Sequence, residues 1–343
     1  MELHFTRTNG PVDDLIDRLI RHAGEVRHPD YVREMILAAL KSGQESKDRI
    51  DLKIMNTTLK EMRFTTKVFS PYRGIKKVTV FGSARTRPDE PIYRLAQEFG
   101  KKLSRAGYMV ITGGGPGIMQ AVNEGAGSEN SFGVNIRLPF EQQMNPVLAH
   151  NPRTITYKYF FNRKVAFLKE SDAVALFPGG FGTLDEAMET LTLVQTGKRA
   201  PLPLILIDEP GGTYWTRYVD FLKEELLVNG YINETDLDLF ERSESLDEAV
   251  ERIRIFYSRY HSLRYVGEKL AIRLLTPIRQ EAVEELHAQF KDILIPQGEM
   301  TLSEALPVES DEPEIAYLPR LLVDFDRRDF ARLRHLIDAI NRL

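Results

Sequence analysis

The sequence predicts an α/β protein with a parallel β-sheet that helices cover on both faces. Between about residues 77 and 257, short runs of β-branched and apolar residues alternate with stretches of helical periodicity. Such alternation is typical of a parallel sheet whose strands are buried on both sides. The second observation is a pair of glycine-rich turns, at residues 112–119 and 177–183, each of which leaves a predicted strand and opens a predicted helix.

The individual elements follow from these patterns. Strands are predicted at 78–81, 108–111, 132–138, 173–177 and 204–207. Helices are predicted at 91–106, through 119 to about 125, and at 157–170, 184–195, 215–227 and 246–257. Ligands of such sheets bind outside the carboxyl ends of the strands, and both glycine turns fall at those ends. We expect the two strands that carry the turns to be neighbours.

The flanking segments have a different character. Residues 11–68 predict three helices, which start at Pro11, at Pro29 and near Asp51. The C-terminal part predicts a small α+β appendage, with strands at 269–275 and 321–325, helices at 277–289 and 328–340, and an acidic break at 310–314. We therefore divide the chain into a helical N-terminal extension (1–74), a sheet domain (75–260) and a C-terminal α+β extension (261–343). The apolar stripes of the first helices predict that they pack against the sheet domain and help to build an oligomer.

The amino-acid composition excludes several kinds of function for this chain. The 343 residues include no cysteine, which excludes disulfides, thiol nucleophiles and zinc–thiolate sites. A net charge of −4 gives no general attraction to nucleic acid or to anionic membranes. The N-terminus lacks the apolar core of a signal peptide, and no stretch reaches the length of a membrane span. From these two features we expect a cytoplasmic protein. The seven histidines have no metal-ligand spacing, so we expect no metal site, and no other cofactor is expected.

The glycine turns predict a binding site for an anion. The first turn of a helix has backbone N–H groups without partners and a partial positive charge, and glycine lets a phosphate approach the backbone closely. The alternative is that glycine and proline only make tight strand-to-helix turns. The second turn carries Thr183 and Glu186, which also match a capping box, in which Glu186 would serve the helix start rather than a ligand.

Two further segments carry groups that suit a nucleotide. On the helix predicted at 157–170, Lys164 interrupts an apolar stripe and Arg163 lies beside it; a basic helix surface is the alternative. The first strand ends at Gly82 and Ser83, followed by Arg85 and Arg87, for which a solvated loop is the alternative. The first glycine turn has Ile118 where a dinucleotide fingerprint requires glycine, and no GK[ST] follows, so an NAD-dependent oxidoreductase is a weak interpretation.

The motifs GGGPGIM and PGGFGTLDE, with RK between them, resemble those of the LOG ("lonely guy") family of phosphoribohydrolases, long mislabelled as lysine decarboxylases. The resemblance covers about residues 76–257, and the flanking segments make the chain similar to long bacterial nucleotide 5′-monophosphate nucleosidases. It implies a Rossmann-like sheet, usually in a dimer. The implied reaction is hydrolysis of the N-glycosidic bond of a nucleoside 5′-monophosphate to the free base and ribose 5-phosphate.

The resemblance also implies roles for particular residues. It assigns catalysis to Arg163 and Glu186. Phosphate and ribose contacts fall on the two glycine turns: Gly179, Gly180, Gly182 and Thr183, with Gly114 and Gly115 nearby. Together with Gly82, Ser83 and Lys164, these form the predicted substrate site. Asp185 stands where many members carry Glu, which leaves open whether it assists.

Glu186 would stabilise an oxocarbenium-like state or orient a water, and Arg163 would hold the substrate in place. A pyridoxal phosphate decarboxylase is disfavoured because Lys164 has no suitable context. The rival interpretation is a non-catalytic nucleotide sensor or a molybdenum-cofactor carrier on the same fold. The sequence does not indicate which base the site prefers.

Overall fold

A computed structural model describes residues 5–139 and 144–343 of the chain. The chain forms two compact units that divide after Arg63. The first unit contains α1 (Pro11–His22), α2 (Pro29–Glu45) and most of α3 (Arg49–Phe69), which confirms the three predicted helices. Within this unit, Asp13 and Arg33 form a buried ion pair. The three-part division of the chain, and the packing and oligomer role of these helices, stay predictions.

The second unit is built on a parallel sheet that has seven strands within the described residues. They are β1 (Lys77–Phe81), β2 (Met109–Thr112), β3 (Ser131–Ile136), β4 (Thr154–Tyr157), β5 (Ala173–Leu176), β6 (Leu204–Ile207) and β7 (Glu241–Ser243). Their spatial order is β4-β3-β2-β1-β5-β6-β7, and all neighbouring pairs are parallel. The predicted α/β fold class is therefore confirmed.

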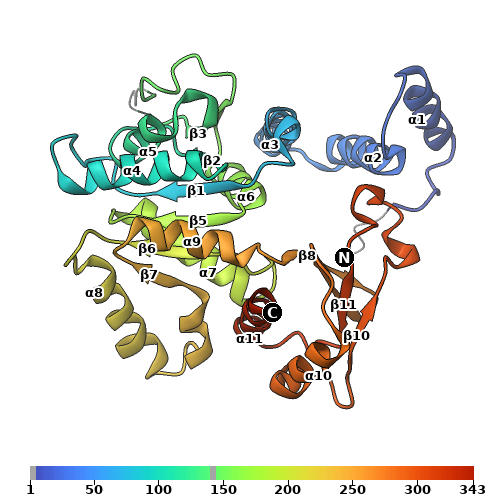
Figure 1. The fold of residues 1–343 in the computed structure, drawn as a ribbon. Helices are drawn as coiled ribbons and strands as arrows, with labels where there is room; N and C mark the ends of the chain where they lie inside the picture. The colour runs from blue at the N-terminus through green and yellow to red at the C-terminus, as the bar shows by residue number, and fades with distance from the viewer. Residues whose placement is uncertain (1–4, 140–143) are drawn as a thin grey trace. The chain divides into compact units, whose positions relative to one another are not determined.

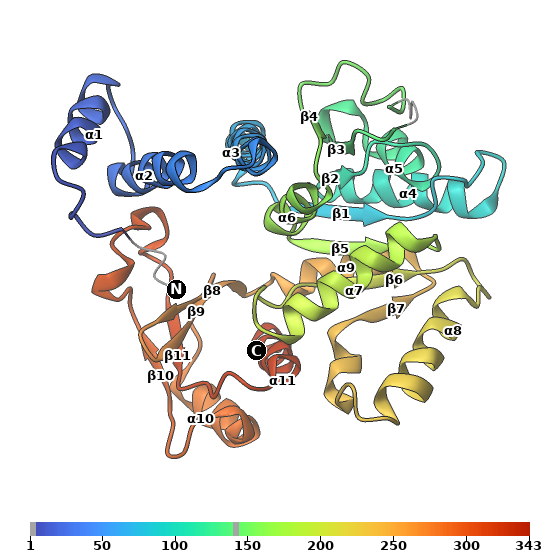
Figure 2. The same cartoon turned by 180° about the vertical axis from the view of Figure 1, so that it is seen from behind.

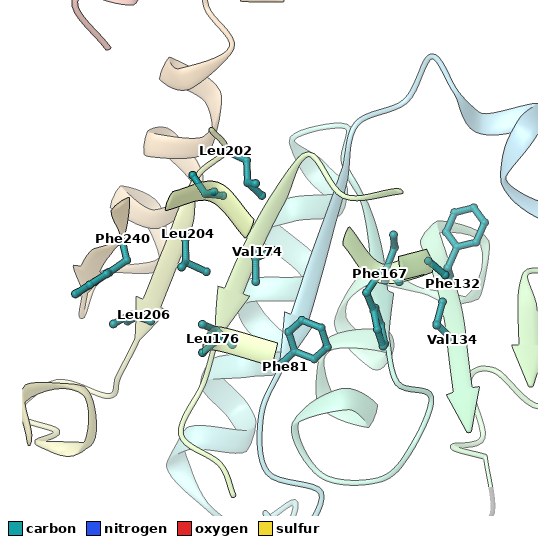
Figure 3. Packing of buried hydrophobic residues seen from close by; sticks show 14 of the residues in the cluster. Phe81, Phe132, Val134, Phe167, Val174, Leu176, Leu202, Leu204, Leu206 and Phe240 are labelled. Atoms are coloured by element: carbon teal, nitrogen blue, oxygen red, sulfur yellow. The ribbon is translucent and has the colours of Figure 1, made fainter. Parts of the chain in front are cut away.

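Helices cover both faces of this sheet (Figures 1 and 2). They are α4 (Pro91–Arg105), α5 (Ile118–Ala126), α6 (Phe160–Glu170), α7 (Phe181–Gln195), α8 (Tyr214–Phe221) and α9 (Leu246–Phe256). Apolar residues of α4, α5 and α9 form one core with the sheet, and those of α6, α7 and α8 form another on the opposite face. Figure 3 shows this second core, in which the rings of Phe81 and Phe167 pack edge to face with centroids 4.8 Å apart.

The local sequence explains these elements. All five residues of β1, KVTVF, are buried, as expected for a β-branched run in the centre of a parallel sheet. Helix α4 begins with Pro91, whose missing N–H costs nothing in the first turn. Its residues Ala96, Phe99 and Leu103 recur at helical spacing and are fully buried. Apolar packing thus holds α4 against the sheet.

The structure corrects several element boundaries. The helix predicted at 157–170 begins only at Phe160, because the residues before it form strand β4, in which Tyr157 pairs with Ile136 and is buried. The helix predicted at 215–227 ends as α8 at Phe221 and continues as a π-helical segment, η3 (Leu222–Leu227). Strand β7 was not predicted. Short 3₁₀ turns occur at Ser70–Tyr72, Ser128–Asn130, Glu234–Leu239, Lys291–Ile293, Pro307–Glu309 and Pro313–Ile315.

The C-terminal part forms a second, antiparallel sheet in the order β10-β11-β9-β8. Its elements are β8 (Tyr260–Val266), β9 (Lys269–Leu274), α10 (Gln280–Gln289), β10 (Met300–Ser303), β11 (Arg320–Val323) and α11 (Phe330–Arg342). Strands β8 and β10 were not predicted. The acidic break predicted at 310–314 lies between β10 and β11, in turns and a 3₁₀ segment. Glu309, just before it, is buried in ion pairs with Arg273 of β9 and Arg320 of β11.

Candidate functional site

Three loops meet at the carboxyl ends of β1, β2 and β5. The expectation that the two glycine turns lie on neighbouring strands is wrong, because β1 lies between β2 and β5. The loop after β1 connects the two turns instead. The Ser83 amide donates to the carbonyl of Pro178 at 3.0 Å, and the Ile118 amide donates to the carbonyl of Ser83 at 3.0 Å. The predicted residues Gly82 and Ser83 therefore lie at the centre of the site.

Close backbone approach explains why glycine stands at these positions. A Cβ on Gly82 would lie 2.6 Å from Cγ2 of Ile118, and one on Gly179 would lie 2.2 Å from Oγ1 of Thr183. Gly117 has a φ of +71°, which disfavours other residues, and a Cβ there would lie 2.2 Å from the carbonyl oxygen of Ser83. The three loops can pack this tightly only without side chains at their contact points.

The first glycine turn is committed to internal contacts. The Gly114 amide donates to Oγ1 of Thr112 at 3.1 Å. The carbonyls of Gly114 and Gly115 accept from the backbone and the side-chain amide of Asn145, at 2.9 and 3.1 Å. Both glycines are buried, and neither lines the cavity at the start of α7. This turn supports the neighbouring loops, and the predicted ligand contacts of Gly114 and Gly115 stay untested.

The second glycine turn opens α7 toward a cavity. Gly180 is the N-cap, and no side chain caps the helix there. The capping-box alternative for Thr183 and Glu186 is therefore wrong: the helix begins earlier, and Glu186 lies near the end of its second turn. A Cβ on Gly180 or Gly182 would meet nothing within 4 Å, so the backbone at this helix start is open to a ligand.

The cavity has a volume of about 650 Å³. Seven predicted site residues line it: Gly82, Ser83, Arg163, Gly180, Gly182, Thr183 and Glu186. The predicted residues Gly114, Gly115, Lys164 and Gly179 do not line it. Sequence reasoning missed the apolar part of the wall, which consists of Phe81, Met119, Phe160, Phe181 and Leu184. Phe181 is 94% exposed at the first position of α7, and this placement beside PGG was the signal that could have revealed it.

Arg163 is held firmly at one side of the cavity. Its Nε donates to the carbonyl of Val134 at 2.9 Å, and its guanidinium lies 4.9 Å from the ring centroid of Phe167. A Cβ on Gly113 would lie 2.7 Å from Nη2 of Arg163, so the first glycine turn leaves room for this side chain. Burial lowers the pKa of the Arg163 guanidinium, and the negative charge of Glu186 partly offsets this. Arg163 is thus oriented before a ligand arrives.

Lys164 points toward the carboxylates of α7. Its Nζ lies 2.6 Å from Oε2 of Glu189, 2.9 Å from Oδ2 of Asp185 and 3.9 Å from Oε2 of Glu186. Burial opposes the charge of Lys164, but hydrogen bonds to Glu189 and Asp185 outweigh it and raise the pKa of the ammonium. The positive charge is therefore largely neutralised within the protein. The substrate contact predicted for Lys164 stays untested.

Glu186 is the buried acid of the cavity. Its side chain is 6% exposed, and burial raises the pKa of its carboxyl to about 7, against the lowering influence of Lys164 and Arg163. A carboxyl with a pKa near neutrality can accept and release a proton under ordinary conditions. The cavity therefore combines an acid–base group, a fixed guanidinium and an open helix start.

Among residues 5–139 and 144–343, no three His, Cys, Asp or Glu side chains come together as a metal site. Within the same residues, no helix is both long and apolar enough to span a bilayer.

The chain is similar in sequence to several known proteins. Residues 119–253 match a family model described as "Possible lysine decarboxylase". The chain is 24% identical over 191 residues to the cytokinin riboside 5′-monophosphate phosphoribohydrolase LOG1 of Arabidopsis thaliana, a match that covers 55% of this chain and 87% of that protein. The chain therefore fits the LOG family, at low sequence identity.

Two solved structures are also similar. One is the X-ray structure of TM1055, with 27% identity, a TM-score of 0.37 and coverage of 52% of this chain and 99% of that one. The other is the molybdenum cofactor carrier protein from Chlamydomonas reinhardtii, with 18% identity, a TM-score of 0.36 and coverage of 52% and 96%.

Proposed function

We propose that this protein hydrolyses the N-glycosidic bond of nucleoside 5′-monophosphates and releases the free base and ribose 5-phosphate. The observation that carries the proposal is Glu186, a buried carboxyl with a pKa of about 7 that lines the same cavity as Arg163 and the start of α7. The names of the plant relatives, which are phosphoribohydrolases of cytokinin riboside 5′-monophosphates, support the reaction class.

The proposed reaction uses each part of the site. The phosphate binds at the open N–H groups of α7, with Gly180, Gly182 and Thr183 around it. The C1′–N bond breaks with its electron pair leaving on the base, and positive charge develops on the ribose. The Glu186 carboxylate stabilises that charge and takes a proton from the water that adds to C1′. Glu186 then gives the proton it took from water to the departed base, so that the products are neutral base and ribose 5-phosphate and the carboxylate is restored.

Arg163 has a positioning role in this scheme. Its Nε is occupied by the carbonyl of Val134, so the rest of the guanidinium fork is held in a fixed direction. A fixed donor keeps the sugar close to Glu186. Its contribution to binding is larger because the guanidinium loses little conformational freedom when the substrate binds. We propose that the substrates are AMP-like nucleotides or cytokinin riboside 5′-monophosphates.

The proposal is tested by incubating the protein with AMP, GMP, CMP and a cytokinin riboside 5′-monophosphate and measuring ribose 5-phosphate. We expect release from at least one of them, with loss in an Arg163→Lys variant, which keeps the charge but not the fork. Tight nucleotide or molybdenum-cofactor binding without turnover across the panel would contradict the proposal and favour a carrier.

We further propose that the protein is a cytoplasmic homodimer or larger homo-oligomer, to which the helices before residue 70 contribute. Several apolar side chains of these helices are exposed in the single chain, among them Leu15 and Leu19 of α1. Such a stripe is stabilised when it is covered. Light scattering on a chain without these helices tests the idea, and an unchanged oligomeric state would count against it.

A further inference from the structure

We propose that Arg85 is the residue that pairs with the 5′-phosphate of the substrate and makes the site select nucleotides over nucleosides. The inference rests on the function proposed above. It assigns a binding role to a side chain from the loop after β1, which lines the same cavity as the start of α7.

The first step is the charge balance of the cavity. Its charged lining residues are Arg85, Arg163, Asp185 and Glu186, so two positive groups face two negative ones. Arg163 is bound to the carbonyl of Val134, and its charge offsets that of Glu186. A phosphate monoester carries about −1.5 to −2 at neutral pH. It therefore needs positive charge that the protein has not already neutralised.

Lys164 does not provide that charge. It is the cation next to Arg163, but its ammonium lies within 4 Å of three carboxylates of α7 and outside the cavity lining. Moving it to a phosphate would leave Glu189 and the buried Glu186 without their cation. Such a rearrangement is costly in a partly buried position.

Arg85 is placed and available for this role. Its backbone amide donates to Oγ of Ser83 at 3.1 Å, and Ser83 is itself fastened to Pro178 of the second glycine turn. The Arg85 side chain is exposed, and no hydrogen bond or ion pair engages its guanidinium within residues 5–139 and 144–343. A guanidinium can bind two phosphate oxygens at once, while the amides at Gly180 and Gly182 bind the others. The two groups together bracket the phosphate.

Arg87 provides the contrast within the same loop. It is also exposed, but its Nε lies 3.4 Å from Oδ1 of Asp89 and 3.3 Å from Oε1 of Glu90. It does not line the cavity. Position and pairing therefore single out Arg85, and Arg87 serves as a matched control with the same side chain two residues away.

The test compares Arg85→Gln and Arg87→Gln with the unmodified protein, using AMP and adenosine. A charge-assisted hydrogen bond of ordinary strength corresponds to a change of about 10- to 100-fold in KM. We expect that increase for AMP in Arg85→Gln with little change in kcat, a partial recovery in Arg85→Lys, and unchanged values in Arg87→Gln. Affinity for adenosine should be the same in all variants. An unchanged KM for AMP in Arg85→Gln overturns the inference.

Calorimetric binding of AMP and adenosine separates this inference from the proposed function, because it needs no turnover. If the unmodified protein binds AMP without cleaving it and Arg85→Gln loses that preference over adenosine, the inference stands and the hydrolase proposal fails. If the protein cleaves AMP and Arg85→Gln binds it equally well, the hydrolase proposal stands and the inference fails. Absence of binding to AMP, GMP, CMP and the cytokinin riboside 5′-monophosphate alike overturns both.

Discussion

Nζ of Lys164 lies 3.9 Å from Oε2 of Glu186, yet 2.6 Å from Oε2 of Glu189 and 2.9 Å from Oδ2 of Asp185. The ammonium is thus shared among three carboxylates and does not fully stabilise the charge on Glu186. Because Glu186 is also buried, its pKa stays near 7 rather than near that of an ordinary glutamic acid. This arrangement gives the cavity its acid–base group.

The first prediction concerns the pH profile. If the ionised form of Glu186 is active, kcat/KM rises as pH increases through about 7 and levels off above it. Replacing Lys164 by Met removes a positive charge near Glu186 and should move this midpoint to higher pH by about one unit. Lys169→Met is the control, because Lys169 pairs with Glu170 on the same helix, away from the cavity. A midpoint that does not respond to Lys164→Met argues against the assignment.

The second prediction concerns stability. The pKa of Glu186 is raised on folding, so the folded state binds more protons than the unfolded state between pH 4.5 and 7, and stability falls as pH rises through this range. Neutral Gln avoids the penalty. Denaturant unfolding should therefore show Glu186→Gln to be more stable than the unmodified protein by about 1–3 kcal/mol at pH 8, and nearly equal at pH 4.5. If Glu186→Gln were less stable than the unmodified protein at pH 8, the fold would not disfavour the charged form of Glu186.

The third prediction separates two glycines of the second turn. Alanine at Gly179 would bring a Cβ to 2.2 Å from Oγ1 of Thr183 and to 2.9 Å from the Ser83 amide nitrogen. Such overpacking typically costs about 1–3 kcal/mol and would displace the loops that form the site. Alanine at Gly182 meets open space, so unfolding should be unchanged within about 0.5 kcal/mol. Equal unfolding free energies for Gly179→Ala and Gly182→Ala would show that the close approach is absent.

The fourth prediction concerns the buried ion pairs of the C-terminal sheet. Glu309 accepts hydrogen bonds from Arg273 at 2.7 Å and from Arg320 at 3.2 Å, and all three are buried. Glu309→Gln leaves the buried Arg320 without a carboxylate partner and leaves Arg273 with Glu312 alone. It should therefore destabilise the protein by roughly 3–5 kcal/mol in denaturant unfolding. Glu314→Gln, at an exposed position in the same segment, should have no measurable effect.

The contribution of Glu309 to stability depends on pH in the opposite direction to that of Glu186. Burial would raise the pKa of Glu309, but hydrogen bonds from the Leu306 amide and the two arginines outweigh it and lower the pKa. Its stabilisation is therefore complete above pH 4.5 and is lost as pH falls through the lowered value. If Glu309→Gln and the unmodified protein differ as much at pH 3 as at pH 7, the ion pairs are not the cause.

Helices and strands in the centre of the fold could be predicted because burial requires apolar residues at regular spacing, and that spacing is visible in the sequence. The short β-branched run that forms β1 is typical of a buried strand, and α4 shows its apolar stripe directly. Edge strands were missed because tertiary contacts define them. Tyr157 was predicted to begin a helix, and only its pairing with β3 shows that it ends a strand. Strand β8 is only partly buried, so its sequence carries a weaker signal.

The candidate site could also be predicted only in part from the sequence. Glycine spacing located the open start of α7, and the motif placed Arg163 and Glu186 in one cavity. The anchor of Arg163 on Val134 and the contacts of Lys164 with Asp185 and Glu189 depend on packing between separate elements. Acidic residues at 185, 186 and 189 on one helix were a visible signal, but only the fold shows that Lys164 faces them.

The most direct test of the account is the rate of ribose 5-phosphate release from nucleoside 5′-monophosphates by the unmodified protein and by Glu186→Gln, at a pH above 8. Glutamine keeps the shape of the side chain and removes its charge and its capacity to take up a proton. General acid–base catalysis contributes about 10²- to 10⁴-fold, so we predict a loss of that size in kcat with nucleotide affinity retained. Equal rates for the two proteins would contradict the central role of Glu186.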